Sequence, residues 1–241
     1  MKEKDVSIIE SGQVFLFNKP LYWTSFDLVN KVRVIIKNVL GIRKIKVGHA
    51  GTLDPLATGL LIICAGRATR RIEDFRDLDK EYIATIHLGE TTPSFDLETE
   101  TDRNYPTDHI NIDLVREVLG QFLGQQEQIP PIYSAKLIDG KRAYEFARKG
   151  MEKELKPVKV VFREIELLEY KFPEVKVRLL CSKGTYIRAF ARDLGEALKS
   201  GAYLSALERT AIGAYRADEA WTIDRFREYV EQLRESDVSD T

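Results

Sequence analysis

The stretch Val47-Gly-His-Ala-Gly-Thr-Leu-Asp-Pro-Leu-Ala-Thr-Gly59 leads directly into residues 60–64, an apolar run that is typical of a buried strand. Three glycines within twelve residues allow this backbone to turn sharply and to approach another group closely. Asp54 has a restricted direction because a proline follows it. An Asp-Pro pair is also common in ordinary turns, so the spacing alone leaves Asp54 as either a turn residue or a reactive carboxylate.

Hydrophobic periodicity predicts the elements that frame this loop. Residues 14–17 form a short apolar run that ends at Asn18-Lys-Pro20, as in a strand that enters a loop. Residues 82–88 alternate between two faces, which also predicts a strand. Ser25 is placed to cap a helix with apolar residues at helical spacing. Those apolar residues are Phe26, Val29, Val32 and Ile36.

The rest of the chain intermixes strands and helices. Two alternating patterns between 159 and 181 predict a pair of strands. Helices are expected at 113–122 and from about 185 to 200, where Gly201 would close the helix. Because regular βαβ spacing is missing, we predict an α+β fold with a mixed, mainly antiparallel sheet flanked by helices.

The composition restricts the class of protein. Of 241 residues, 44% are hydrophobic, and the formal net charge is −1, which excludes a long disordered chain. The longest apolar run, residues 60–65, is far too short to span a bilayer, and the first five residues lack the apolar stretch of a secretory signal. Two cysteines cannot form a disulfide framework, and three scattered histidines show no metal-ligand spacing. We therefore expect a soluble, cytoplasmic globular protein without a metal.

Charge is unevenly distributed along the chain. Residues 31–50 carry six basic groups and no acid, and residues 136–163 carry nine basic groups against four acidic ones. Residues 90–117 and 218–241 are acidic, with net charges of −6 and −5. A single lysine-rich run is most often a solvated face. Two such segments with aromatic neighbours favour a nucleic-acid partner, because a local positive field holds phosphate.

Arg188 lies near the first turn of the helix predicted at 185–200, where a cation opposes the helix dipole. We therefore expect an anionic group beside it, either a carboxylate or a ligand phosphate. The common alternative is a surface arginine bonded to water. The core face predicted for this helix consists of Ile187, Phe190 or Ala191, Leu194 and Leu198.

Aromatic side chains offer candidate contacts to a ligand. Tyr82 lies on the apolar face of its strand, where a phenol is most often a core residue with one hydrogen bond. Tyr133 follows a Pro-Pro pair, and a further aromatic pair lies between Arg142 and Arg148, which suits stacking on unpaired bases. A small helical hairpin that packs on itself would give the same pattern.

A cluster of carboxylates suggests a different chemistry. In a strand, four alternating acids would face one way and could hold Mg²⁺ for phosphoester cleavage. Because residues 91–109 are polar and acidic, an exposed acidic loop is the favoured alternative. The four residues are Asp96, Glu98, Glu100 and Asp102.

Several separate motifs, in the same order along the chain, resemble the bacterial tRNA pseudouridine-55 synthases of the TruB type. The resemblance covers about residues 13–223, and so many motifs in order are not expected by chance. They are Lys19-Pro with Thr24-Ser25, the loop 48–59, Gly66-Arg-Ala-Thr69, Lys80-Glu-Tyr82, Gln128-Ile-Pro-Pro-Ile-Tyr-Ser-Ala135 with 140–148, Cys181-Ser-Lys-Gly-Thr-Tyr-Ile-Arg188 and Leu207-Glu-Arg-Thr210.

The resemblance implies a role for individual residues. Asp54 would be the catalytic aspartate, Arg188 its ion-pair partner, and Tyr82 would stack on the target base and serve in proton removal. The residues implied in substrate binding are His49, which would hold the flipped-out T-loop, Tyr186 and Leu207, which would line the uracil pocket, Lys19, which would support the catalytic loop, and Tyr133, Arg142 and Arg148 of the RNA-gripping insertion.

The resemblance also implies a domain organisation and a reaction. Residues 13–223 would be a catalytic domain of the pseudouridine synthase fold with a central active-site cleft and a thumb-like RNA-binding insertion at 124–155. Residues 1–12 would be an N-terminal extension and 224–241 an acidic tail, with no separate C-terminal RNA-binding domain. The implied reaction converts uridine 55 in the T-loop of tRNA to pseudouridine by base flipping, without cofactor or metal. A monomer is expected, with no membrane and no protein partner.

Two residues depart from the family pattern, and two other functions stay open. Tyr22 stands where the family usually has glycine, and Ala50 replaces a usual threonine. A Mg²⁺-dependent phosphoesterase would use the carboxylates at 96–102, and a non-catalytic tRNA chaperone would not need Asp54. In the implied reaction, Asp54 could add to the uracil ring, attack the sugar or remove a ribose proton.

Overall fold

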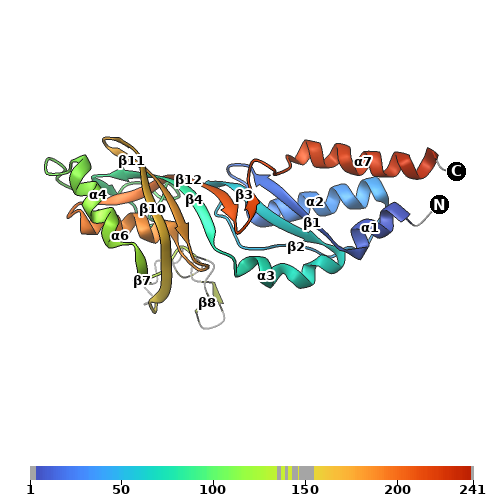
Figure 1. The fold of residues 1–241 in the computed structure, drawn as a ribbon, viewed down its shortest axis with the longest axis horizontal. Helices are drawn as coiled ribbons and strands as arrows, with labels where there is room; N and C mark the ends of the chain where they lie inside the picture. The colour runs from blue at the N-terminus through green and yellow to red at the C-terminus, as the bar shows by residue number, and fades with distance from the viewer. Residues whose placement is uncertain (1–3, 135–136, 139–140, 143–145, 147–154, 240–241) are drawn as a thin grey trace. The chain divides into compact units, whose positions relative to one another are not determined.

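A computed structural model describes residues 4–134, 137–138, 141–142, 146 and 155–239 (Figure 1). The chain divides into two compact units, which we name by their place in the sequence. The outer unit consists of the two ends of the chain, Met1–Lys80 and Glu208–Thr241, and the middle unit consists of Glu81–Leu207. Strands and helices are intermixed in both, and the strands pair mainly antiparallel, which confirms the predicted α+β class. No helix in the described part is long and apolar enough to cross a membrane.

The outer unit contains the strand order β1-β3-β12, with β2 paired to β3 and β13 to β12. Strand β12 contributes residues to both units. The elements of this unit are α1 (Lys4–Gly12), β1 (Gln13–Lys19), α2 (Ser25–Leu40), β2 (Val47–His49), β3 (Ala57–Ala65), a 3₁₀ helix (Gly66–Arg71), α3 (Ile72–Arg76), β12 (Ala202–Ile212), β13 (Tyr215–Arg216) and α7 (Ile223–Ser239).

Strands β1 and β3 form the centre of the outer unit and confirm the strands predicted at 14–17 and 60–64. They pair antiparallel from Gln13 opposite Ala65 to Lys19 opposite Gly59. Helices α2 and α7 contact each other (Figure 1), and Phe226 of α7 is fully buried in the same apolar cluster as the two strands. The β1–β3 register places the segment after β1 beside the loop that precedes β3.

Helix α2 corrects two details of the sequence prediction. Thr24 is the N-cap in place of Ser25, because Thr24 and Asp27 form a capping box: the Asp27 N–H donates to Thr24 Oγ1 at 3.0 Å and the Thr24 N–H donates to Asp27 Oδ2 at 2.9 Å. Phe26 is 61% exposed, so its assignment to the apolar face was wrong. The buried residues of α2 are Ser25, Leu28, Val29, Val32, Ile35 and Ile36.

The middle unit contains the strand order β12-β4-β11-β10-β7. Strand β4 shows strict alternation of buried and half-buried residues, as predicted at 82–88. The elements are β4 (Lys80–Leu88), β5 (Glu90–Thr91), β6 (Arg103–Asn104), α4 (Ile112–Gln121), β7 (Gly124–Gln128), β8 (Leu137–Ile138), β9 (Lys141–Arg142), β10 (Val158–Lys171), β11 (Glu174–Cys181) and α6 (Ile187–Ala197).

Helix α6 has the predicted core face, since Ile187, Phe190, Ala191, Leu194 and Leu198 are all buried. Its C-terminal end differs from the prediction. The left-handed residue that ends the helix is Lys199, with φ 53°, and the N–H of Ser200 donates to the carbonyl of Gly195 at 2.9 Å. Gly201 therefore does not close the helix.

Candidate active site

The loop that carries Asp54 is held by hydrogen bonds on both sides of this residue. The Ser25 hydroxyl donates to the Leu53 carbonyl at 3.0 Å and accepts from the Leu53 N–H at 2.9 Å. Beyond Asp54, the Ala57 N–H donates to the Asp54 carbonyl at 3.0 Å, which closes a turn. The N–H of Tyr22 donates to the Pro55 carbonyl at 2.8 Å. The backbone of Asp54 is thus fixed by the start of α2 and by the segment after β1.

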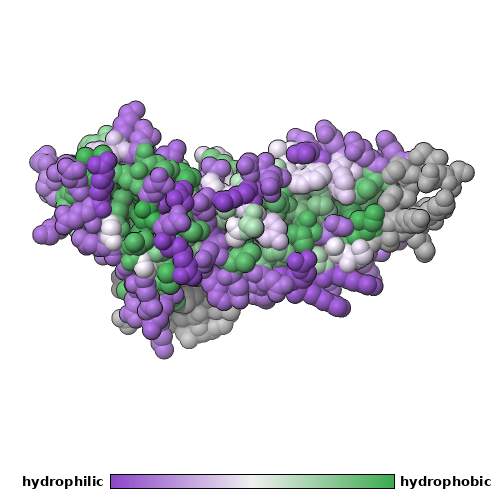
Figure 2. Space-filling view, viewed as in Figure 1, coloured by the Kyte–Doolittle hydropathy of each residue, from purple (hydrophilic) through white to green (hydrophobic). Residues whose placement is uncertain are grey.

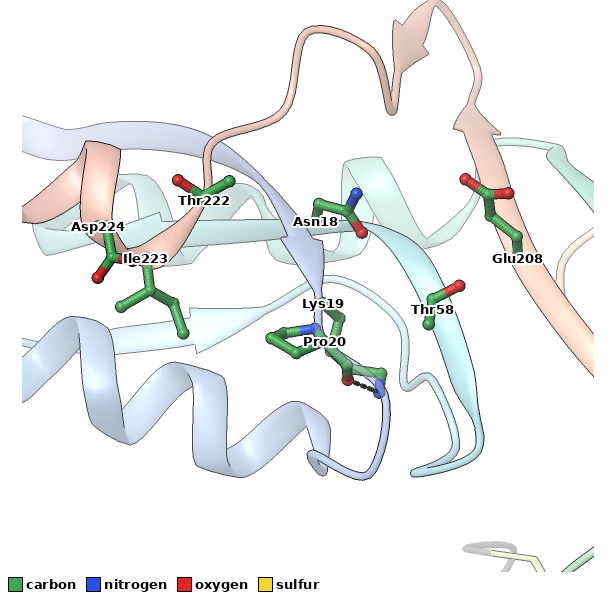
Figure 3. A pocket seen from close by; sticks show the side chains of 8 residues that line it. All are labelled: Asn18, Lys19, Pro20, Thr58, Glu208, Thr222, Ile223 and Asp224. Carbon is green, nitrogen blue, oxygen red and sulfur yellow. Dashed lines mark hydrogen bonds between the residues drawn. The ribbon is translucent and has the colours of Figure 1, made fainter.

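Lys19 is fully buried and supports the same loop from the end of β1. Its Nζ donates to the carbonyls of Pro20 at 2.9 Å, Trp23 at 2.7 Å and Pro55 at 3.4 Å. Burial lowers the pKa of Lys19 to about 8, although the nearby carboxylate of Asp54 raises it. Lys19 lines an open pocket of about 510 Å³ together with Asn18, Thr58 and Glu208, whose side chains are drawn in Figure 3.

Arg209 is a second buried cation at this loop, and no role was predicted for it from the sequence. Its side chain is 1% exposed. Nε donates to the Leu60 carbonyl at 2.8 Å, Nη1 to the Thr52 carbonyl at 3.4 Å and Nη2 to the Gly51 carbonyl at 3.2 Å. The guanidinium therefore joins the segment before Asp54 to the strand after it.

The structure explains why residue 59 of the loop is a glycine. Its φ is +98°, and a Cβ atom there would lie 2.3 Å from the carbonyl oxygen of Arg209. Both the backbone conformation and the close approach of β12 therefore require glycine. Its N–H donates to Asn18 Oδ1 at 3.2 Å, which ties the end of the loop to β1.

His49 and Ala50 lie at the start of the loop. His49 pairs with Ile63 across β2 and β3, and burial lowers the pKa of its imidazole, which favours the neutral ring at pH 7. Ala50 is fully buried in an apolar cluster with Leu60 and Ile62. Its methyl group suits that surrounding, in which the hydroxyl of a threonine would need a polar partner.

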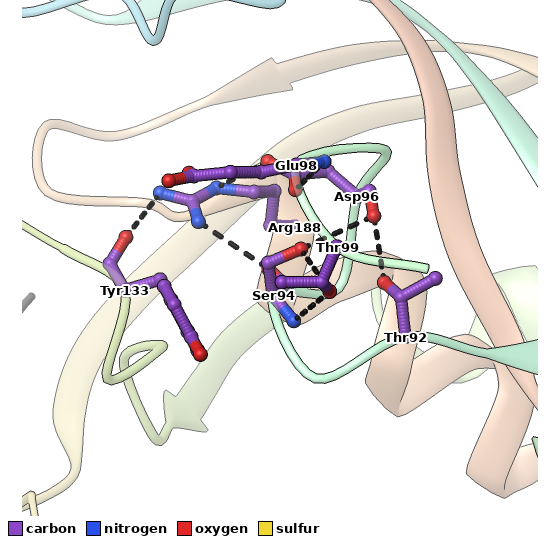
Figure 4. A network of polar contacts seen from close by, with 7 residues as sticks. All are labelled: Thr92, Ser94, Asp96, Glu98, Thr99, Tyr133 and Arg188. Carbon is purple, nitrogen blue, oxygen red and sulfur yellow. Dashed lines mark hydrogen bonds and ion pairs between the residues drawn. The ribbon is translucent and has the colours of Figure 1, made fainter. Parts of the chain in front are cut away.

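Arg188 lies in the middle unit, in a buried polar network shown in Figure 4. Its Nε lies 3.4 Å from Asp96 Oδ2, and both side chains are less than a tenth exposed. Nη2 donates to the Tyr133 carbonyl at 2.8 Å and Nη1 to the Ser94 carbonyl at 3.3 Å. The predicted anionic neighbour is confirmed as a carboxylate, and the alternative of a water-bonded surface arginine was wrong.

The same network argues against the magnesium interpretation of residues 96–102. This segment forms turns instead of a strand, so its acids do not share one face. Asp96 is buried, and its Oδ1 accepts from the Glu98 N–H at 2.9 Å, whereas the side chains of Glu98, Glu100 and Asp102 are exposed. In the described part of the chain, no group of three or more metal-ligating side chains converges.

The remaining predicted residues also lie in the middle unit. Tyr82 is 8% exposed on β4, and Leu207 is half-buried on β12. Tyr186 is the N-cap of α6, and its N–H and carbonyl both bond the side chain of Gln128, at 2.8 Å and 3.1 Å. Gln128 is thus a further positioning residue, visible in the sequence only as part of a motif. Within the 124–155 insertion, the side chain of Arg142 and all of Arg148 lie outside the described residues.

Comparison with known proteins identifies the family. Residues 37–187 match the model of the TruB family pseudouridylate synthase (N terminal domain). A curated relative from Phocaeicola vulgatus, tRNA pseudouridine synthase B, is 57% identical over 95% of this chain and 97% of its own length. The chain belongs to the TruB family. The resemblance stated from the sequence motifs is therefore confirmed.

A second curated relative and a solved structure agree with this assignment. The tRNA pseudouridine synthase B of Flavobacterium johnsoniae is 50% identical over 90% of this chain and 95% of its own. Among solved structures, a chain of a Cbf5-Nop10-Gar1 complex superposes with a TM-score of 0.72 at 27% identity, over 96% of this chain. This chain spans 58% of that one, so the similarity supports the pseudouridine synthase fold and not the partners of that complex.

Proposed function

We propose that this chain is a tRNA pseudouridine synthase that isomerises uridine 55 in the T-loop of tRNA. The observation that supports this most is the 57% identity, over nearly both full lengths, to a protein named tRNA pseudouridine synthase B. The geometry of the Asp54 loop agrees with it, because two buried cations and Ser25 form hydrogen bonds with the backbone of that loop. A carboxylate on a preorganised loop suits nucleophilic or basic chemistry.

The reaction breaks the C1′–N1 bond of uridine, turns the uracil and joins C1′ to C5. The proton on C5 then leaves and N1 gains one, so that substrate and product are isomers. We propose that Asp54 supplies the nucleophile or base and that Tyr82 stacks on the uracil and serves in removal of the C5 proton. No redox step occurs, so the reaction needs no redox cofactor.

Arg188 and the binding residues complete the proposal. Arg188 would pair with the carboxylate of Asp54 in addition to its buried contact with Asp96. Tyr186 and Leu207 would line the uracil pocket, and His49 would help to hold the flipped-out conformation of the T-loop. The insertion at 124–155, with Tyr133, Arg142 and Arg148, would grip the T-arm, and its basic residues would offset the cost of removing the base from the stack.

We further propose the domain organisation implied by the family: a catalytic domain at 13–223 that acts as a monomer without a protein partner. The tRNA substrate supports the cytoplasmic location expected from the sequence. The acidic segment 224–241 includes most of α7, whose Phe226 and Val230 are fully buried. This segment, with a net negative charge in the sequence, is not expected to contact tRNA phosphate.

The test uses an unmodified tRNA transcript in buffer with EDTA. The wild type, Asp54→Asn and a control, Asp74→Asn, are each incubated with it, and pseudouridine is mapped by carbodiimide labelling and primer extension. Asp74 is a matched control because its side chain is 72% exposed in the same unit. We expect a stop at uridine 55 with the wild type and Asp74→Asn only. Activity of Asp54→Asn would refute the role of Asp54, and tRNA binding without any stop would favour the chaperone alternative.

A further inference from the structure

An exposed apolar surface lies beside the Asp54 loop. Hydrophobic and hydrophilic residues are mixed on the face in Figure 2, and large apolar side chains are exposed at ten positions of the described residues. Four of the ten fall within residues 21–34, which we call the α2 patch: Leu21 (43% exposed), Tyr22 (74%), Phe26 (61%) and Val34 (49%). Such a concentration is unusual for surface residues that contact only water.

The backbone of Tyr22 is in a conformation that favours glycine. Its φ is +66°, in the left-handed region, where a side chain is disfavoured. The surrounding contacts impose this conformation, because the Tyr22 N–H bonds Pro55 and Lys19 bonds the carbonyls on both sides, at Pro20 and Trp23. Glycine would satisfy the same turn without strain, so the backbone alone does not explain a tyrosine here. The phenol ring is the feature that requires a reason.

The patch borders an open groove of about 480 Å³ with a positive side. The groove is lined by Tyr22, Trp23, Asp27, Asn30, Lys31 and Val34. Lys31 makes no ion pair with any residue that the structure describes, and residues 31–50 contain six basic groups and no acid. Asp27 is the one acid of the groove, and its Oδ2 already accepts from the N–H and the hydroxyl of Thr24, at 2.9 Å and 2.6 Å. An aromatic ring next to a lysine that has no ion pair among the described residues complements a base and its phosphate.

We propose that the α2 patch is a binding site for an unpaired nucleobase of the RNA substrate, with Tyr22 stacking on the base and Lys31 contacting the phosphate. This inference rests on the proposed function. The base bound at the α2 patch would lie near the target uridine, because the N–H of Tyr22 donates to the carbonyl of Pro55, the residue after Asp54. The backbone that carries the ring is already held by hydrogen bonds before RNA arrives, so little ordering of the backbone is required on binding.

The first experiment measures kcat and KM for tRNA with Tyr22→Gly. Glycine fits a φ of +66°, so this variant removes the ring and should fold with a melting temperature no lower than that of the wild type. We expect KM to rise by about 5- to 150-fold, the loss typical of one base–aromatic stack, with kcat retained. Tyr22→Phe should keep the KM of the wild type. Ile8→Ala, at an exposed apolar residue of α1, is the matched control and should change neither parameter.

The second experiment locates the base with T-arm hairpins that each contain one abasic position. At one position the abasic change should weaken binding to the wild type and have no further effect on Tyr22→Gly, which shows that ring and base act together. An unchanged KM for Tyr22→Gly, with an active wild type, would overturn the inference and leave the proposed function standing. Loss of a dimer in sedimentation without a change in KM would overturn it in favour of contact with a second copy. An inactive wild type would refute the proposed function itself.

Discussion

Arg209→Met is the sharpest structural test of how the Asp54 loop is held. In the wild type, the buried guanidinium donates to the carbonyls of Leu60, Thr52 and Gly51. Methionine has a similar length and no donors, so it would leave these three carbonyls without that partner. Because the affected carbonyls belong to the loop and its exit strand, the damage should be concentrated there and not spread over the core.

The expected magnitude follows from the three bonds. A hydrogen bond from a charged donor contributes about 1.5–3 kcal/mol, so we assign about 2 kcal/mol to the 2.8 Å bond and about 1 kcal/mol to each longer one. Replacing arginine with methionine also removes the free-energy cost of burying a cation, which offsets roughly half of the loss from the three hydrogen bonds. The net loss is then about 2 kcal/mol, which lowers the melting temperature by roughly 4–8 °C and leaves the protein folded.

Activity should suffer far more than stability. A displacement of about 1 Å at a catalytic group lowers turnover by about 100-fold, and Arg209→Met frees the loop to move by that much. The assay is tritium release from tRNA labelled at C5 of uridine, since that hydrogen leaves when C1′ bonds C5. Arg209→Lys keeps the charge but cannot reach all three carbonyls, so its turnover should lie between that of the wild type and that of Arg209→Met. Full turnover in Arg209→Met, with its stability lowered as expected, would refute the positioning role.

Two further predictions concern buried charges. Lys19 has a pKa lowered to about 8 against its ordinary 10.5, so above pH 8 the folded state loses a proton that the unfolded chain retains. Stability should therefore rise from pH 8 to 10.5 relative to Lys19→Met, by at most about 3 kcal/mol in urea titrations, and parallel curves would contradict this. Asp96→Asn removes the carboxylate charge beside the buried Arg188, so unfolding in urea should require about 3 kcal/mol less. Adding Arg188→Met to Asp96→Asn should recover part of that loss, and strictly additive losses would show that the pair is not coupled.

Local patterns in the sequence predicted the elements well. The strands at 14–17, 60–64 and 82–88 and the core face of α6 follow from periodicity, which depends only on neighbours in the chain. The polar groups that cap or close helices were harder to assign. At α2, two adjacent hydroxyl residues could each cap the helix, and only the structure shows that Ser25 bonds Leu53 instead.

Long-range contacts account for most of what sequence reasoning missed. Arg209 bonds Gly51 across 158 positions and Arg188 bonds Ser94 across 94, and no local spacing signals either contact. The dipole argument for Arg188 predicted that an anion was needed but did not identify Asp96, which was grouped with exposed acids. Tyr22 illustrates the converse: the sequence marked it as a departure, while its positive φ and 74% exposure came from the structure.

Lys19 and Arg209, the buried cations described above in the outer unit, donate to the same kind of acceptor, and this bears on catalysis. Every hydrogen bond found from Lys19 and Arg209 to the described residues ends on a backbone carbonyl and none on a carboxylate. A carbonyl oxygen carries no titratable proton, so these acceptors stay the same when the contacts of the Asp54 carboxylate change during the reaction. Holding the loop through its backbone carbonyls therefore fixes the position of Asp54 independently of the contacts that its carboxylate makes.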